Sequence, residues 1–267
     1  MKNRLLLWLL FLSLFSSPAF GQSENMPYKV DWLRDGAITA GGIGATVIGS
    51  TIILNKERLT EADLANLNED DVNRFDRFLA GKYSKRAEQD SDYPFYGSFV
   101  SPLLLLLDPD VRQNAPQVYL LYGQAMSIAG GLYALTAGLT NRKRPSVYAE
   151  DAPLDVRLHK YATNSFYAGH TAATASATFF VAKVFHDFNP DSPARYIIWA
   201  AAAAVPATVG YLRMRAGKHF LTDNIIGYAI GTGIGILVPE LHKRESRISL
   251  LPSSSTLYDG VAVVYSF

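Results

Sequence analysis

The chain has 267 residues, with 25 lysines and arginines against 24 aspartates and glutamates, and it contains no cysteine. This length suits one domain with a sizeable core, and the even charge balance leaves no basic excess for a nucleic-acid partner. The lack of cysteine excludes disulfide bonds and thiol catalysis.

Residues 1–21 have the composition of a secretory signal peptide. Lys2 and Arg4 precede an apolar run that is followed by small residues up to Gly21. A basic start, an apolar run shorter than a bilayer needs, and a small-residue cleavage site are typical of an export signal. We therefore predict export with cleavage after Gly21, and the alternative is an uncleaved signal anchor.

Apolar stretches of low charge fill most of the remaining chain. None alternates like a half-buried strand and most exceed strand length, so we predict that they are helices. The stretches are 36–54, 95–107, 118–139, 165–182, 196–212 and 224–239. The predicted fold class is all-α, a helical bundle of about five or six apolar helices, associated with a membrane and occupying residues 22–245.

Small residues on the first stretch indicate a close helix contact. Gly41, Ala45 and Gly49 are spaced four apart and share one helical face. Such a face lets another helix approach closely, in membrane bundles and in soluble helix pairs alike.

The polar segment 56–94 is predicted to be a helical insertion. Thr60 is suited to the N-cap of a helix and Asp63 to its third position. Asp70 and Asp71 superficially resemble part of a calcium loop, but the glycine and glutamate of that loop are missing, so we interpret them as a solvated acidic face. The last segment, 246–267, is predicted to be a tail with a short strand.

Clusters of basic residues, glycine and carboxylates stand at the ends of three apolar stretches. They are Asn141–Pro145, Ser165–Ala172 and Arg213–Asp223. In a bundle of antiparallel helices these ends meet at one mouth. We therefore expect the three clusters to form one site.

The residue types in these clusters predict phosphoryl transfer. His219 and Asp223 are four residues apart, so Asp223 can accept the Nδ1 proton of His219 and leave the other ring nitrogen free. Arg144 and Arg213 offer guanidinium forks to a phosphate or carboxylate. Gly169, before a helix, adds backbone N–H groups that favour an anion. Each feature alone is also typical of ordinary surface contacts, and the prediction rests on their combination.

The clusters resemble the motifs of the type-2 phosphatidic-acid phosphatase superfamily, which is related to class A bacterial acid phosphatases and vanadium haloperoxidases. The family motifs are lysine, six residues and Arg-Pro; Pro-Ser-Gly-His; and Ser-Arg, five residues, histidine, three residues and aspartate. The resemblance spans residues 118–239, and the matching residues are Arg144, Pro145, Gly169, His170, Arg213, His219 and Asp223.

This resemblance implies a role for each matching residue. His219 would be the nucleophile that forms a phosphohistidine, Asp223 would orient it, and His170 would protonate the leaving group. Arg144 and Arg213 would hold the phosphate oxygens. Neither a metal ion nor another cofactor is implied.

The chain departs from the family motifs at several positions. Ala137 stands in place of the lysine, and loss of one such donor commonly lowers a rate by ~10²–10³. Arg142, Lys143 or Lys160 are the replacements that the sequence offers. The other departures are Tyr167, Ala168 and Leu212.

The predicted function is hydrolysis of a phosphate monoester or diphosphate on a lipid, such as phosphatidate, a polyprenyl diphosphate or lipid A. The expected partners are a membrane and a phosphorylated lipid or small phosphoester, with no nucleic acid. The alternatives are a periplasmic phosphatase of soluble phosphomonoesters and a non-catalytic envelope relative of the family.

The family's site usually lies on the external side of the membrane. An exported start followed by crossings of every apolar stretch would place the loop 140–164 in the cytoplasm instead. Stretch 95–107 contains Pro102 and is short for a crossing. We therefore predict that it does not cross, or that the bundle lies outside the membrane, so that the site faces the periplasm.

Overall fold

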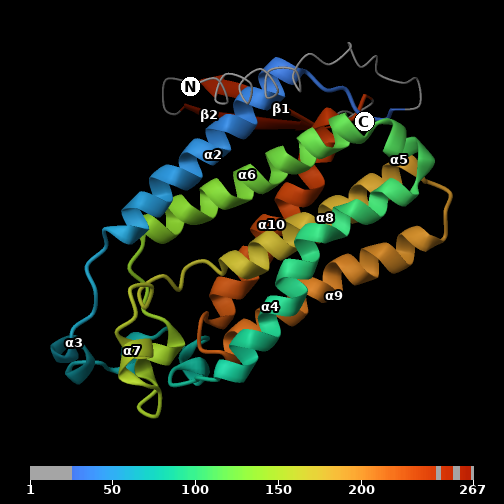
Figure 1. Ribbon diagram of the computed structural model, residues 1–267. Coiled ribbons are helices and arrows are strands. Elements are labelled where there is room, and N and C mark those ends of the chain that lie inside the picture. Colours follow the sequence, from blue (N-terminus) through green and yellow to red (C-terminus); the bar gives the residue numbers. More distant parts are fainter. Residues whose placement is uncertain (1–25, 245–247, 255–258, 266–267) are drawn as a thin grey trace, which may run out of the picture.

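The structure is a computed structural model, and it describes residues 26–244, 248–254 and 259–265. The signal peptide predicted for residues 1–21 lies outside this part. The described chain is helical apart from one pair of strands near its C-terminal end (Figure 1). The all-α prediction is confirmed.

The helices of the described residues come first along the chain, and the two strands follow them. The α-helices are α2 (Trp32–Leu54), α3 (Glu61–Ala65), α4 (Lys85–Val100), α5 (Pro109–Gln113), α6 (Ala115–Leu139), α7 (Leu154–Arg157), α8 (Gly169–Phe188), α9 (Ala194–Arg215) and α10 (Leu221–His242). The 3-10 helices are η1 (Glu69–Asp71), η2 (Arg77–Leu79), η3 (Ser101–Leu107) and η4 (Pro145–Tyr148), and the strands are β1 (Ile248–Ser254) and β2 (Asp259–Tyr265).

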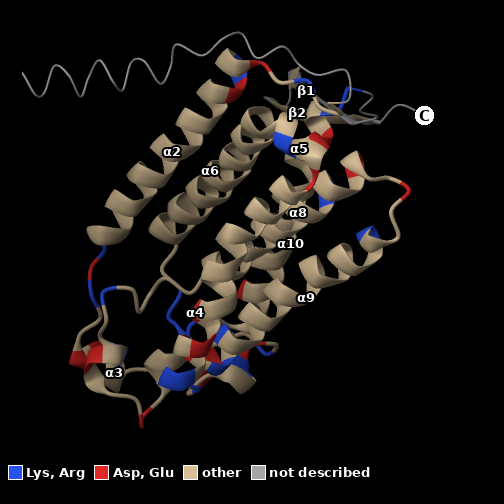
Figure 2. Cartoon of the chain, turned by 45° about the vertical axis from the view of Figure 1, so that its right-hand side comes forward, with Lys and Arg blue, Asp and Glu red and all other residues tan. Residues whose placement is uncertain are grey.

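Four of the described helices, α2, α6, α9 and α10, are long and apolar enough to cross a membrane. Only 6% of the apolar window of α2 is buried, and Ile43, Val47 and Leu54 are exposed along it. Charged residues gather towards the two ends of the bundle (Figure 2). Apolar side chains exposed along a whole helix are suited to lipid, so the bundle is membrane-associated.

The central helix is α8, which contacts α4, α6, α9 and α10. Glycines on α10 set its distance from α8. A Cβ added at Gly227, Gly231 or Gly235 would lie 2.6, 2.1 or 2.6 Å from a backbone oxygen of Ala168, Ala172 or Ser176. Because these contacts leave no room for a side chain, the start of α8 is held against the start of α10.

Helix α2 packs on α6 through small residues, but the predicted face is wrong by one position. A Cβ added at Gly42 or Gly49 would lie 2.7 or 2.3 Å from the α6 backbone, whereas Gly41 faces open space. Ala45 completes the contact. The contacting positions are spaced three and then four apart, because a helix has 3.6 residues per turn and a strict spacing of four drifts off the face. We call Gly42, Ala45 and Gly49 the glycine seam.

Stretch 95–107 is not part of any described helix that is long and apolar enough to cross a membrane, so its failure to cross stays a prediction. Helices α4 and η3 together nevertheless run the length of the bundle (Figure 1). At one end Glu88 of α4 pairs with Lys218, which follows α9. At the other end Asp108, which follows η3, accepts a hydrogen bond from Asn189, which follows α8. A proline lies inside α4 and another begins η3, and the chain tightens there into a 3-10 helix instead of turning back.

The described chain enters the bundle at the end where α10 finishes. The N–H of Lys29 donates to the carbonyl oxygen of His242 over 2.7 Å, and Tyr28 forms a bridge with Lys243. The connections 140–168 and 216–220, which carry the predicted clusters, lie at the opposite end (Figure 1). We call this opposite end the site end.

Predictions for the polar segments are met in part. Thr60 and Asp63 form the expected reciprocal cap, but the helix that they begin, α3, has only five residues. Asp70 and Asp71 are exposed. Near the C-terminal end β1 and β2 pair antiparallel, whereas the sequence predicted one short strand. Two strands form because the backbone N–H and C=O groups of each bond to those of the other.

Candidate active site

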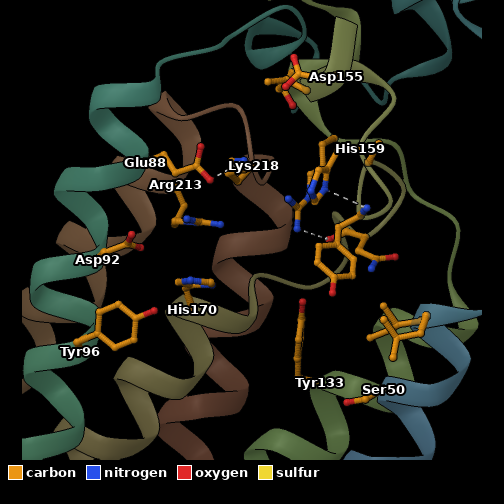
Figure 3. A pocket seen from close by; sticks show the side chains of 18 residues that line it. Ser50, Glu88, Asp92, Tyr96, Tyr133, Asp155, His159, His170, Arg213 and Lys218 are labelled. Atoms are coloured by element: carbon orange, nitrogen blue, oxygen red, sulfur yellow. Dashed lines mark hydrogen bonds and ion pairs between the residues drawn. The ribbon is translucent and has the colours of Figure 1, made fainter. Parts of the chain in front are cut away.

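The three predicted clusters converge on a cavity of about 660 Å³ at the site end (Figure 3). Arg144 reaches it from the connection between α6 and α8, His170 from α8, and Arg213 from the end of α9. Lys218 reaches it from the turn between α9 and α10. This concentration of positive side chains suits an anionic ligand.

The turn after α9 depends on Gly217. This glycine has a φ of 69°, and the N–H of Lys218 donates back to the carbonyl oxygen of Arg213 over 3.0 Å. The pattern is a Schellman motif, in which the positive φ favours glycine. A Cβ at Gly217 would also lie 1.9 Å from the carbonyl oxygen of Lys82. The turn brings Lys218 and His219 beside Arg213.

His219 is held in one tautomer by the backbone. Its side chain is 1% exposed, and Nδ1 lies 2.6 Å from the carbonyl oxygen of Ser165. A carbonyl oxygen only accepts, so Nδ1 carries the proton and Nε2 keeps its lone pair. Burial, and next the charges of Arg144 and Arg213, hold the pKa of His219 well below its usual value. The imidazole is therefore neutral, which is the nucleophilic form.

The predicted hydrogen bond between Asp223 and His219 is wrong. Asp223 Oδ2 accepts from Ser165 Oγ over 2.6 Å and from the N–H of Phe220 over 2.9 Å, while Oδ1 accepts from Arg142. Phe220 is the N-cap of α10, so His219 lies outside the helix and does not share a face with Asp223. Asp223 is therefore linked to His219 indirectly, through the hydroxyl of Ser165 and through the N–H of Phe220, the residue that follows His219.

Arg142, proposed from the sequence as a phosphate ligand, does not line the cavity. Its Nη2 pairs with Asp76 over 2.6 Å, and its Nη1 contacts Asp223. Asp76 is fully buried and also accepts from the N–H of Thr222 over 3.0 Å. No sequence pattern indicates Asp76 as a site residue, because it stands in the polar insertion outside the three clusters. The insertion thus secures the start of α10.

The other replacements offered for the missing lysine are also outside the cavity. Lys143 borders a separate surface pocket beside Phe220, and Lys160 lies 4.8 Å from the ring centroid of Tyr161. Ala137 itself is fully buried. The position that corresponds to the family's lysine therefore contributes no charge, and none of the three proposed residues supplies it.

Lys56 reaches this region from the end of α2, a contact that the sequence did not indicate. Its Nζ donates to the carbonyl oxygen of Ala137 over 2.9 Å, to Asn164 Oδ1 over 2.7 Å and to the carbonyl oxygen of Thr140. An ammonium group has three protons, and here each has a protein acceptor. Lys56 therefore fastens α2 to the connection after α6 and is no phosphate ligand.

Arg213 is buried and Arg144 is half-buried, and both are incompletely bonded. Arg213 is 4% exposed, and its Nη1 lies 3.4 Å from Ser91 Oγ. Arg144 Nη2 lies 3.5 Å from the carbonyl oxygen of Asn164. The Nε atoms of both arginines find no hydrogen-bond acceptor among the described residues. Unpaired buried donors cost free energy, and an anion between the two guanidinium groups removes that cost.

His170 and Gly169 occupy different surroundings although they are adjacent. The ring of His170 lines the cavity and lies against Phe95, with ring centroids 4.1 Å apart. Gly169 does not line the cavity, and a Cβ there would lie 2.6 Å from the ring of Tyr133. The glycine therefore makes room for Tyr133, a further lining residue, while the first turn of α8 points its N–H groups towards the site end.

The site offers cations and histidines rather than a ring of metal ligands. Among the described residues, no group of three or more histidines, aspartates and glutamates is placed to hold a metal ion. Asp223 is instead bonded to Arg142 and a backbone N–H group, and Glu88 is bonded to Lys218.

Comparison with known proteins agrees with this site. The sequence profile of the PAP2 superfamily matches residues 118–247, which contain all three clusters. No curated protein matches the chain. A similar solved structure is the crystal structure of the first transmembrane PAP2 type phosphatidylglycerolphosphate phosphatase from Bacillus subtilis, at 17% identity over 78% of this chain and 91% of that chain, with a TM-score of 0.42. Residues 118–247 of this protein, just under half of the chain, are therefore similar to the PAP2 superfamily.

Proposed function

We propose that the protein is a phosphatase that transfers a phosphoryl group from a lipid phosphate or diphosphate to His219 and then to water. One observation carries this proposal: a buried neutral histidine with Nδ1 fixed lies in the field of two incompletely bonded arginines whose Nε atoms are buried. A lone pair beside a preformed anion site is the arrangement that nucleophilic attack on phosphorus requires.

The proposed reaction has two steps. In the first, Nε2 of His219 attacks phosphorus, the bond from phosphorus to the leaving oxygen breaks, and His170 gives that oxygen a proton. In the second, water attacks the phosphohistidine, His170 takes the proton of the water, and the bond from nitrogen to phosphorus breaks. Arg144 and Arg213 stabilise the equatorial oxygens in both steps. Burial, and next the charges of Arg213 and Arg144, hold the pKa of His170 well below its usual value. The negative charge of the bound phosphate opposes this and favours the protonated form that the first step needs.

A lipid substrate suits the position of the cavity. Ser50, Ile53 and Leu54 of α2 form part of its wall, so the anion site adjoins a helix whose outer surface is apolar. A phosphate carried on an acyl or prenyl chain can then place its charge among the arginines while the chain stays beside α2.

Purified protein in detergent is expected to release inorganic phosphate from phosphatidate or a polyprenyl diphosphate, with EDTA present throughout. The same assay with glycerol 3-phosphate is expected to give a lower kcat/KM. If the protein releases phosphate from none of these esters, the proposed phosphatase activity is refuted. A loss of activity in EDTA would refute metal independence, and a preference for the soluble ester would refute the lipid substrate.

We also propose that the cavity opens to the periplasm, on the side implied by the family resemblance. The site end is opposite the end that holds Tyr28 and Lys243. In a bundle that crosses the membrane, a periplasmic site therefore places Met26 on the cytoplasmic side. An exported N-terminal end and a periplasmic site would put both ends of the bundle in the periplasm. Both predictions are therefore compatible only with a bundle that lies wholly outside the membrane.

Single cysteines in this cysteine-free chain test the orientation. Lys160 is exposed at the site end, and Asp191 is exposed in the α8–α9 turn at the other end. With an impermeant thiol reagent on intact spheroplasts, we expect Lys160→Cys to be labelled and Asp191→Cys to be protected until lysis. The reverse pattern would place the site in the cytoplasm, and labelling of both would indicate a bundle outside the membrane.

A further inference from the structure

A third cation lies at the cavity, and the mechanism above does not use it. Lys218 immediately precedes His219, lines the cavity and is 14% exposed. Its Nζ lies 2.7 Å from Oε1 of Glu88, which projects from the facing helix α4 (Figure 3). Among the described residues that line the cavity, it is the only lysine.

The free protons of Lys218 distinguish it from the other basic residues nearby. Lys56 donates all its protons to protein oxygens, and Arg142 is bonded to Asp76 and Asp223. Lys218 has one acceptor, Glu88, for an ammonium group with three protons. Two of its protons are therefore available to an anion in the cavity.

The electrostatic surroundings of Lys218 also suit an anion. Burial lowers the pKa of Lys218, the hydrogen bond with Glu88 opposes this, and the charges of Arg144 and Arg213 lower it further. Three cations that converge on one cavity repel one another unless negative charge lies among them. Glu88, Asp92 and Asp155 also line the cavity and supply part of that charge, and of the three only Glu88 pairs with Lys218.

We propose that Lys218 is a third ligand of the transferred phosphoryl group and that Glu88 is the residue that positions it. The inference rests on the proposed phosphatase function. It also accounts for Ala137, because the turn at Gly217 brings a lysine from the third cluster to a site in which alanine stands in place of the lysine of the family's first motif. The ammonium stabilises the phosphoryl oxygens and takes no part in proton transfer.

Opposite effects of two substitutions test this inference. Lys218→Ala removes a cation, so kcat/KM is expected to fall by ~10²–10³ and the inhibition constant of inorganic phosphate to rise about tenfold. Glu88→Gln removes an anion but keeps the ammonium. It is expected to lower the inhibition constant a few-fold while reducing kcat/KM, because Lys218 loses the partner that aims it.

Further variants separate this role from a structural one. Lys218→Arg should restore most of the activity, and Lys218→Met keeps the length of the stem if the alanine variant does not fold. Lys85→Ala, which removes an exposed lysine of the same helix as Glu88, is the matched control and should behave like the unchanged protein.

Two results would overturn the inference. The first is an inhibition constant of inorganic phosphate that is unchanged in both Lys218→Ala and Lys218→Met. The second is a rise in that constant in both Lys218→Ala and Glu88→Gln, which would indicate that the ion pair is purely structural. If the unchanged protein releases no phosphate, the proposed function fails. If it does release phosphate and the lysine variants match it, only this inference fails.

Discussion

Replacement of His219 by alanine or asparagine is expected to lower the rate of phosphate release by at least ~10⁴, because the nucleophile is removed while the anion site remains. Asparagine is the sharper variant. Its side-chain amide can still donate to the carbonyl oxygen of Ser165, so the buried contact is kept but the lone pair of Nε2 is lost. The measurement is phosphate release from phosphatidate under saturating and limiting substrate.

A matched control and a trapping experiment complete this test. His186→Ala removes a histidine at the far end, where its Nδ1 accepts from Trp199 Nε1 over 3.1 Å, and should leave turnover unchanged. Rapid acid-free quenching with radiolabelled substrate should give a labelled, alkali-stable phosphoprotein in the unchanged chain and none in the His219 variants. Normal turnover in His219→Asn would refute the nucleophile assignment.

Asp223→Asn is expected to reduce both stability and activity, although Asp223 does not touch His219. The carboxylate is fully buried and accepts from Ser165, Phe220 and Arg142. An amide offers one oxygen and one NH₂ group, so at least one buried donor loses its acceptor. We expect a loss of about 2–4 kcal/mol in unfolding free energy and a fall of ~10² in kcat, because the Ser165 carbonyl that fixes the imidazole loses its support.

Asp70→Asn is the control for Asp223→Asn, since it alters an exposed carboxylate that pairs with Arg77 over 2.8 Å. Exposed pairs contribute about 0–1 kcal/mol, so its thermal midpoint and turnover should stay close to those of the unchanged protein. Unchanged turnover in Asp223→Asn, with a lowered midpoint, would make the aspartate a purely structural residue and would break the proposed link through Ser165.

Helix-end motifs made much of the site predictable from the sequence. Arg144, His170, Arg213 and His219 each stand at the end of a long apolar stretch, and antiparallel helices bring such ends together. The apolar stretches themselves were long enough to identify as helices without knowledge of their partners. Arg144, His170 and Arg213 therefore line one cavity, as predicted, whereas His219 is buried and does not line it.

The partners of those residues were not predictable, for two physical reasons. The contact expected for Asp223 depended on whether α10 begins before or after His219, and helix boundaries are uncertain by a few residues in any sequence pattern. Lys56 and Asp76 come from outside the motifs, and only tertiary packing brings them to the site. No local periodicity signals such a contact.

The glycine seam ties the chemistry to a helix that carries none of the motifs. A Cβ at Gly49 would meet the α6 backbone at 2.3 Å. Lys56, which follows the end of α2, holds Asn164 next to Ser165. A larger side chain at Gly49 would push α2 outwards and draw Lys56 away from the segment that fixes His219. Random mutagenesis with selection for lost turnover should therefore recover substitutions in this lipid-facing helix. Such a substitution would impair turnover by displacing Lys56, and not only by disturbing membrane insertion.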